Sequence, residues 1–375
     1  MQSSASPHWR PVLRVCALTL LLLLSGTAAV QAQDEAEDGS ELDSAVQDLL
    51  AEHFEADGPG AAVAVLKGGA VRAKAAIGLA DIEAGTPIDA DTVFDLASVS
   101  KQFTATAILK LAADVKLDVR KPLSVYVSDF ELRSPVRQVR VADLVFHTSG
   151  LADYSSEAWD GTDAEFAALT TETHLKWINE TEPLQPPGVS YVYNNSGYAL
   201  LALVVERVSG QRFDAYARDR LFLPAGMKST RVYTRLGQRF PRQATGYKRS
   251  EDGSVEASSS PSVIAGDGNV FSTVNDLIAW NQALDGNRLL SPPQRRALWA
   301  RGTLDNGRAI DNDGQGYGYG WVIEGQGRVS HSGSWYGTAT YLLRDNPKKI
   351  AVIVLSNDEN AAVSEIAEAL AALVE

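Results

Sequence analysis

The sequence is poor in the residues on which several kinds of hydrolytic site depend. Its single cysteine is Cys16, so a chain that has lost its first 32 residues can form no disulfide and no thiolate nucleophile. The five histidines are scattered and no His-Glu-x-x-His occurs, which disfavours a metallohydrolase. No Gly-x-Ser-x-Gly occurs either, so the nucleophile elbow of the classical α/β-hydrolases is missing. We therefore expect neither a metal ion nor an organic cofactor.

Positive charge is also scarce. Lys and Arg number 34 against 47 Asp and Glu, which gives a formal net charge of −13 at pH 7. An acidic chain repels phosphate backbones, so we expect no nucleic-acid partner. The 45% of hydrophobic residues over 375 positions are ample for a large buried core, and the composition is that of a globular protein.

The most apolar run near the N-terminus, Val15–Leu24, is too short to span a bilayer comfortably. It follows Arg10 and Arg14 and precedes small residues that end in Val30-Gln31-Ala32, the pattern of a signal peptide cleaved after Ala32. We predict a signal peptide over residues 1–32, a loose acidic leader over 33–40, and a periplasmic or secreted protein without a stable membrane anchor. A retained anchor is the alternative.

Strand patterns occur at both ends of the chain. Ala61–Lys67 and Ala70–Leu79 flank Gly68-Gly69, a pair suited to a tight hairpin turn. The C-terminal third contains four more strand-like runs, namely Tyr317–Glu324, Arg328–His331, Ala339–Arg344 and Ile350–Leu355. Helical spacing is found before the first strand, over residues 42–54, and after the last, over residues 361–374.

The middle of the chain is mostly helical in pattern, as in Ala105–Ala113 and Tyr198–Ser209, and Ser250–Ser262 reads as a surface loop. The simplest fold is of the α/β (α+β) class: one antiparallel sheet built from both chain ends, with flanking helices and an inserted helical subdomain over roughly residues 98–260. We expect residues 41–375 to form this domain.

The first chemical signal is Ser98-Val99-Ser100-Lys101. If a helix starts at Ser98, side chains three apart meet on one face, which places the Lys101 amine beside the Ser98 hydroxyl. A hydroxyl is a weak nucleophile until a base takes its proton, and a desolvated lysine can be that base. The alternative is an exposed helix start with a serine cap and a solvated lysine.

Two further signals lie downstream. Tyr193-Asn194-Asn195 offers a phenol that can relay a proton and an amide at Asn195 that can bond both a lysine and a substrate carbonyl. His331-Ser332-Gly333 ends a predicted strand, where an edge N–H, for example that of Ser334, could complete an oxyanion hole with the Ser98 N–H. A turn with a packed tyrosine, and a strand-end histidine, are the plainer interpretations.

Taken together and in this order, the three motifs resemble those of the serine β-lactamase and penicillin-binding-protein superfamily, in particular its class C β-lactamase and DD-peptidase branch. Two other segments are similar to segments of that family: residues 143–151, which read DLVFHTSGL, and residues 270–277, which contain VFST and then DL. The resemblance extends from about residue 41 to the end of the chain. It implies a β-lactamase/transpeptidase-like fold with the site between the sheet and the helical subdomain.

The resemblance also implies roles. It makes Ser98 the nucleophile of an acyl-enzyme, assigns proton transfer to Lys101 and Tyr193 in an undecided division, and assigns substrate positioning to Asn195. It places His331, Ser332, Gly333 and Ser334 on the substrate side, and gives His147 a supporting role in the fold.

His331 stands where class C β-lactamases have a lysine, and a neutral histidine gives up the fixed charge that helps bind a β-lactam carboxylate. We therefore expect a serine hydrolase that cleaves an amide or ester in a small molecule or short peptide, like a D-alanyl carboxypeptidase or an esterase. A β-lactamase and a non-catalytic penicillin- or peptide-binding domain are the alternatives. Trp335 and Tyr336 either line an aromatic acyl pocket or merely cover the strand end.

Overall fold

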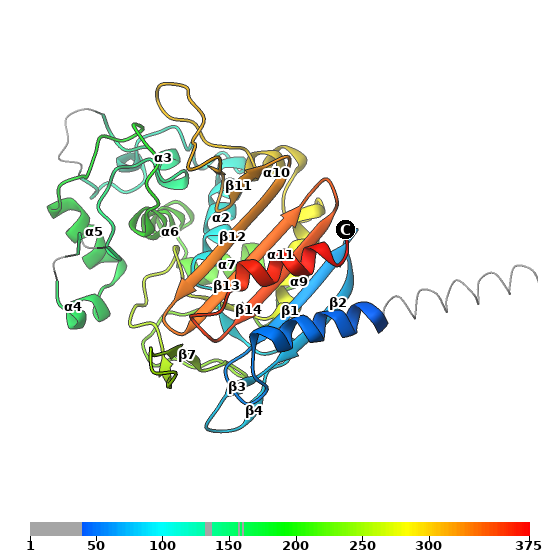
Figure 1. The fold of residues 1–375 in the computed structure, drawn as a ribbon. Coiled ribbons are helices and arrows are strands. Elements are labelled where there is room, and N and C mark those ends of the chain that lie inside the picture. Colours follow the sequence, from blue (N-terminus) through cyan, green and yellow to red (C-terminus); the bar gives the residue numbers. More distant parts are fainter. Residues whose placement is uncertain (1–39, 132–136, 157, 160) are drawn as a thin grey trace, which may run out of the picture.

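A computed structural model describes residues 40–131, 137–156, 158, 159 and 161–375 (Figure 1). The predicted signal peptide, and the predicted leader up to residue 39, lie outside the described residues. Within these described ranges, no helix is both long and apolar enough to cross a membrane.

A seven-stranded sheet forms the centre of the fold, and both chain ends contribute to it, which confirms the predicted fold class. Every neighbouring pair is antiparallel, and β1 joins the two ends by pairing Ala61 with Ser356 and Lys67 with Ile350. In spatial order the strands are β10 (Gly316–Tyr317), β11 (Val322–Gly325), β12 (Arg328–Trp335), β13 (Thr338–Asp345), β14 (Ile350–Ser356), β1 (Ala61–Lys67) and β2 (Ala70–Ile77).

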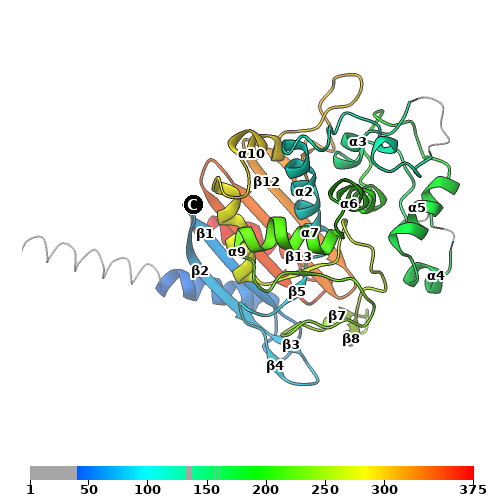
Figure 2. The ribbon, with the colours of Figure 1, turned by 180° about the vertical axis from the view of Figure 1, so that it is seen from behind.

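Helices cover both faces of this sheet (Figures 1 and 2). On one face lie the helix over residues 40–53 and α11 (Val363–Ala372); on the other lie α9 (Val274–Asp285) and α2 (Lys101–Ala113). Val63 and Val65 therefore pack in one core while Ala64 and Leu66 pack in the other. A strand buried on both faces needs apolar side chains at every position, which explains the unbroken apolar run of β1.

The remaining helices lie mostly between α2 and α9 in the chain. Those within residues 141–209 lie beside the sheet in Figure 1, whereas the helix over residues 213–217 lies across the face that Figure 2 shows. They are α3 (Val141–Val145), α4 (Asp163–Ala167), α5 (Thr171–Glu180), α6 (Asn195–Ser209), α7 (Phe213–Ala217), α8 (Leu223–Ala225) and, after α9, α10 (Pro292–Leu298), with a π-helix at Arg218–Phe222 and 3₁₀ helices at Ala97–Ser100 and Leu123–Val125. The boundaries of the helical subdomain, residues 98–260, stay a prediction.

Three small sheets complete the structure. They are β3 (Leu79–Asp81) with β4 (Thr86–Pro87); β5 (Phe94–Asp95), β9 (Val270–Ser272) and β6 (Arg231–Val232); and β7 (Gly246–Arg249) with β8 (Val255–Ser258). The last pair corrects the prediction of a loop over Ser250–Ser262, because β8 lies inside that stretch. Pairing with β7 gives this Ser-rich segment the strand conformation that its composition does not favour.

Two other elements differ from prediction at the positions that matter most. The α-helix begins at Lys101, and Ser98 lies in the 3₁₀ turn before it. The predicted strand Tyr317–Glu324 is interrupted at residues 318–321, where Gly320 has φ +75° and comes so close to the start of α2 that a Cβ would lie 2.7 Å from the Lys101 carbonyl group. Both departures arise where distant segments converge on the start of α2.

Candidate active site

The turn that carries Ser98 is held in an unusual conformation. Ala97 has φ +46°, a region that costs a non-glycine residue on the order of 1 kcal/mol. The Asp95 carboxylate accepts the Ala97 N–H at 2.9 Å, and the Thr340 hydroxyl donates to the Leu96 carbonyl at 2.9 Å. These bonds tie the turn to the sheet and leave Ser98 half-buried at the start of α2.

Gly333 allows β12 to approach this turn. A Cβ at Gly333 would lie 2.3 Å from the Leu96 carbonyl oxygen and 2.3 Å from the Thr340 hydroxyl. Any other residue would push the strand and the Ser98 turn apart. The glycine predicted on the substrate side therefore has a positional role: it sets the distance between nucleophile and strand.

Lys101 is fully buried, and its amine lies 3.1 Å from the Ser98 hydroxyl. The same amine donates to two oxygens that can only accept, the Asn195 side-chain carbonyl at 2.7 Å and the Asp267 backbone carbonyl at 2.8 Å. A neutral amine has two hydrogens and one lone pair. When both hydrogens go to these carbonyls, the lone pair is left for Ser98.

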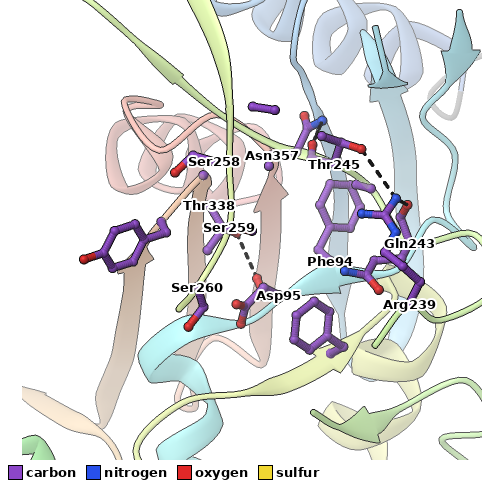
Figure 3. Close-up of a pocket in the computed structure, with 16 residues that line it drawn as sticks. Phe94, Asp95, Arg239, Gln243, Thr245, Ser258, Ser259, Ser260, Thr338 and Asn357 are labelled. Carbon is purple, nitrogen blue, oxygen red and sulfur yellow. Dashed lines mark hydrogen bonds between the residues drawn. The ribbon is translucent and has the colours of Figure 1, made fainter. Parts of the chain in front are cut away.

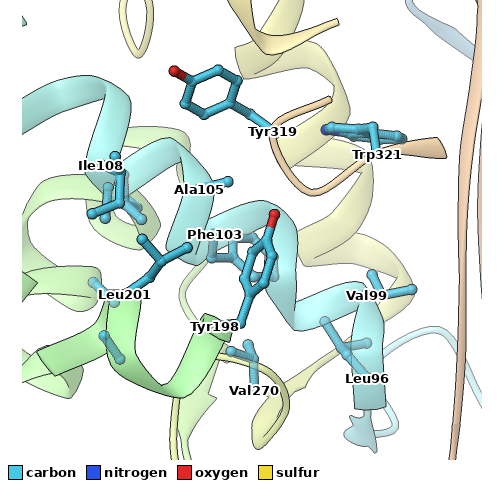
Figure 4. Close-up of a cluster of buried hydrophobic side chains, with 14 of the residues drawn as sticks. Leu96, Val99, Phe103, Ala105, Ile108, Tyr198, Leu201, Val270, Tyr319 and Trp321 are labelled. Carbon is cyan, nitrogen blue, oxygen red and sulfur yellow. The ribbon is translucent and has the colours of Figure 1, made fainter. Parts of the chain in front are cut away.

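Burial also lowers the pKa of Lys101, to about 8, because desolvation disfavours the ammonium form more than nearby Asp267 and Asp153 favour it. The helix that presents Lys101 is anchored by a dense apolar cluster (Figure 4). The Phe103 ring packs edge-to-face against Phe222, with ring centroids 5.3 Å apart, and at a tilt against Trp280, with centroids 4.6 Å apart, which anchors the first turn of α2.

Asn195 begins α6, and its position is determined by the residues around it. Its N–H donates to Asp153 at 2.7 Å and its side-chain amide to the Ser155 hydroxyl at 2.7 Å, which leaves the carbonyl for Lys101. Asn194 caps the helix by accepting the Gly197 N–H at 2.7 Å. The Tyr-x-Asn motif thus forms a helix start that aims Asn195 at Lys101.

The Tyr193 ring lies over the Lys101 amine, which is 4.9 Å from the ring centroid. Burial around the phenol raises its pKa, and a hydrogen bond with Ser98 lowers it by less. The residue as a whole is still 36% exposed. With its pKa raised, the Tyr193 phenol stays protonated, and the residue lies between Ser98 and the solvent.

His147 packs against the segment that carries Tyr193 and Asn194. Its Nδ1 accepts the Asn194 N–H at 3.0 Å, so the proton sits on Nε2, which has no hydrogen-bond partner among the described residues. The ring packs at 4.4 Å against Tyr193 and at 4.4 Å against Tyr317. Burial holds the pKa of His147 well below its usual value, so this imidazole stays neutral and serves to position the motif.

His331 is only 3% exposed and does not line the pocket at Ser98. Its Nδ1–H donates to the Ser332 carbonyl at 2.6 Å, and its Nε2 accepts from the Tyr317 hydroxyl at 2.9 Å. Burial lowers the pKa of His331 to about 3, so the ring is neutral at physiological pH. In this geometry the His331 ring holds the Tyr317 hydroxyl by a hydrogen bond and presents no group to the pocket that Ser98 lines.

Of the other predicted positions on β12, Ser334 lines the pocket, whereas Ser332 is exposed and does not. β11 pairs only with Arg328–Ser330, so no described strand covers the outer edge of β12 from His331 onward. An unpaired strand edge beside a nucleophile can supply an N–H to a developing oxyanion.

The structure brings Ser98, Tyr193, Asn195 and Ser334 together around a pocket of about 170 Å³. Tyr154 and Asp267 also line it, as does Trp335, one of the two aromatic residues expected at the strand end. The sequence analysis did not identify Asp267 as a site residue. The signal for it in the sequence is the flanking pair Gly266 and Gly268. Gly266 has φ +112°, and a Cβ there would lie 2.4 Å from the Tyr198 carbonyl oxygen, so the position requires glycine.

A second cavity of about 290 Å³ lies beside the nucleophile turn and shares no lining residue with the first (Figure 3). The Trp335 indole, which lines the first pocket, donates at 2.8 Å to the Ser260 hydroxyl, which lines the second. Asp95 faces this second cavity, and burial raises its pKa to about 6. Among the residues that the structure describes, no three His, Cys, Asp or Glu side chains gather in a way that could hold a metal ion.

Comparison with known proteins identifies the family of this chain. The family model named Beta-lactamase matches residues 42–375. The chain belongs to the Beta-lactamase family. Penicillin-binding protein 4* of Bacillus subtilis (strain 168) is 32% identical over 314 residues, which cover 79% of this chain and 68% of that protein.

Two further relatives of this Beta-lactamase family member are informative. A D-aminopeptidase of Brucella anthropi is 29% identical over 88% of this chain, which spans 62% of that protein's length. The crystal structure of a penicillin binding protein from Bacillus halodurans has a TM-score of 0.76 and 27% identity, covering 88% of this chain and 99% of that one. These comparisons show that the protein is a serine hydrolase related to β-lactamases and penicillin-binding proteins, which confirms the prediction from the sequence.

Proposed function

We propose that Ser98 is the nucleophile and that neutral Lys101 takes its proton. The Ser98 oxygen attacks the carbonyl carbon of an amide or ester, and the proton moves to the Lys101 nitrogen. As the bond to the leaving group breaks, that proton passes through the Tyr193 hydroxyl to the leaving nitrogen or oxygen. Water then attacks the acyl-enzyme by the reverse route and releases the acid and free Ser98.

The observation that carries this proposal is the hydrogen-bond pattern of the buried Lys101 amine, whose lone pair is left for Ser98 when its two hydrogens go to carbonyls. The raised pKa of Tyr193 supports the division of labour, because a phenol that stays protonated can relay a proton but is a poor resting base. The Ser98 N–H and an N–H of the β12 edge near Ser334 would hold the oxyanion.

Neutral His331 favours peptidase, amidase or esterase activity over β-lactamase activity, since it offers no fixed charge to a carboxylate. The relatives named D-aminopeptidase and penicillin-binding protein support the same choice. A domain that binds peptides without turnover would not need a buried lysine aimed at a serine.

The test combines intact mass spectrometry with turnover of p-nitrophenyl butyrate. The wild type should acquire a covalent acyl group from the ester or from benzylpenicillin, and Ser98→Ala should lose both the adduct and about 10³-fold or more of kcat/KM. Ser254→Ala, at an exposed serine in the β7–β8 turn, serves as the matched control and should behave as wild type. Full activity in Ser98→Ala would refute the proposal, and rapid penicillin hydrolysis would establish the β-lactamase alternative.

We also propose that the protein is exported and loses residues 1–32. The charged start, short apolar run and small residues before Gln33 support this. N-terminal sequencing of protein from the periplasm or culture medium should begin at Gln33. Recovery of an intact N-terminus in the membrane fraction would favour the retained anchor.

A further inference from the structure

The second cavity, of about 290 Å³ beside the nucleophile turn, contains a carboxylate with spare bonding capacity (Figure 3). Asp95 is half-buried there, and its Oδ1 accepts the Ala97 N–H at 2.9 Å. Its Oδ2 accepts no hydrogen bond from the described residues, and it does not belong to the buried side-chain atoms that lack a partner. This oxygen is therefore accessible, and a molecule that enters the cavity can donate to it.

Arg239 brings a positive charge to the same cavity. One guanidinium nitrogen makes two contacts, at 3.3 Å with the Gln243 backbone carbonyl and at 3.4 Å with the Thr245 hydroxyl. Both distances are longer than those of a good N–H···O bond. The structure shows no other hydrogen bond or ion pair of this side chain among the described residues, and Arg239 is exposed. Most of its five N–H donors are therefore free for a ligand.

The two charges do not compensate each other. Figure 3 shows Asp95 and Arg239 on different sides of the cavity. Burial, and to a smaller extent the negative charge of Asp267, raise the pKa of Asp95 to about 6, and no cation of the described residues opposes this rise. An arginine in contact with the carboxylate would lower that pKa. Each charge is thus left for a ligand that carries the opposite one.

We propose that the second cavity is a binding site, separate from the catalytic pocket, for a short peptide with both ends free, whose ammonium group binds Asp95 and whose carboxylate binds Arg239. The cavity volume lies near the lower limit of pockets that hold small molecules, and two residues of extended chain span about 7 Å. The Ser258 and Ser259 side chains also line the cavity, and their hydroxyls can bond the peptide group between the two ends.

This site differs from the catalytic pocket in its position and in its charge. It shares no lining residue with the pocket at Ser98, and no arginine or lysine of the described residues lines that pocket. A peptide bound at Asp95 would contact the nucleophile turn from outside, because the same carboxylate accepts the Ala97 N–H. We therefore expect it to bind without displacing a substrate from Ser98.

The first experiment is isothermal titration calorimetry of the purified protein with three probes. Glycylglycine has both charges, N-acetylglycylglycine lacks the ammonium group, and glycylglycinamide lacks the carboxylate. Glycylglycine should bind once per chain and at least about tenfold more tightly than either blocked probe, because hydrogen bonds between charged groups are the strong ones. Absence of glycylglycine binding, or equal affinity for all three probes, would overturn the proposal.

Two variants assign the ends of the peptide. Asp95→Asn should weaken glycylglycine about tenfold or more and leave the affinity for N-acetylglycylglycine within about threefold of wild type. Arg239→Gln should weaken glycylglycine to a similar extent and leave the affinity for glycylglycinamide unchanged. Arg235→Gln is the matched control, since Arg235 is exposed in the same segment and does not line the cavity, and it should bind all probes as wild type does. A loss in Arg239→Gln that is the same for all three probes would contradict the assignment, and this result stands even where Asp95→Asn does not fold.

The last measurements locate the peptide and set its length. Glycylglycine should bind Ser98→Ala as tightly as wild type and leave the KM for p-nitrophenyl butyrate unchanged, so the result does not depend on the role of Ser98. A competitive rise of that KM would place the peptide in the catalytic pocket and refute a separate site. Glycine carries both charges on one carbon and should bind at least about tenfold more weakly than glycylglycine. Equal affinity for glycine would refute the assignment to a peptide, since a free amino acid would then suffice.

Discussion

Gly333 tests how closely β12 must approach the nucleophile. In Gly333→Ala the added methyl meets the Leu96 carbonyl and the Thr340 hydroxyl at 2.3 Å, so the Ser98 turn must shift. A displacement of this kind costs on the order of 100-fold in rate, and we expect kcat/KM for p-nitrophenyl butyrate to fall by about that factor while the protein stays folded. Gly286→Ala is the control, because nothing lies closer than 3.7 Å to its Cβ, and its activity should be unchanged. Wild-type activity in Gly333→Ala would show that the contact is not needed.

Lys101 gives a prediction about pH. Its pKa is lowered to about 8, and the base is the neutral form, so kcat/KM for the uncharged butyrate ester should rise with pH and level off above about 8. His331 titrates near pH 3 and should add no limb between pH 5 and 7. A profile that is flat from pH 6 to 10 in the wild type would argue against Lys101 as the base.

The site also shows what residue patterns can and cannot predict. Ser98, Lys101, Tyr193 and Asn195 were predicted as site residues because each proposed chemical role needs a particular side chain. The structure brings all four together, whereas their roles stay a prediction. Lys101 also donates to the backbone carbonyl of Asp267. Every residue type has a backbone carbonyl, so residue identity could not predict this contact. The burial of His331 was missed because it depends on Tyr317, which a short strand places over it.

At the scale of elements, apolar periodicity was a good guide where packing alone decides the structure. β1 was predicted with its exact bounds, and β14 and α11 to within a few residues, because each buries a continuous apolar face. The 3₁₀ turn at Ala97–Ser100 was not predicted. Its positive φ is held by tertiary bonds from Asp95 and Thr340, and helix propensity contains no such information.

The helix α11 provides a test of how separate the two cores are. Ile366 is fully buried between α11 and the sheet, on the face opposite α2 and the nucleophile. Ile366→Ala should lower the free energy of unfolding by about 2–5 kcal/mol in denaturant titrations. At 25 °C the kcat of the folded enzyme should remain within about twofold of wild type. Glu365→Ala, at an exposed position of the same helix, should change neither, and a large loss of kcat in Ile366→Ala would mean that the cores are coupled.

At the scale of the whole molecule, the net charge and the catalytic pocket have the same sign. The full chain carries −13, and loss of Arg10 and Arg14 with the predicted signal peptide leaves −15. A negative protein with an acid, Asp267, at its catalytic pocket draws cations inward over distances that salt can screen. Anionic substrates, β-lactams included, meet the opposite field.

Ionic strength therefore tests whether the charge of the whole molecule takes part in substrate capture. Raising salt from about 0.01 M to 1 M shortens the Debye length from about 30 Å to about 3 Å. We expect kcat/KM for a free-amine alanine amide to fall by about 3- to 10-fold over this range, while the value for the uncharged butyrate ester stays within about twofold. Equal salt responses for the charged and uncharged substrates would mean that the acidity of the chain has no part in substrate capture and serves solubility alone.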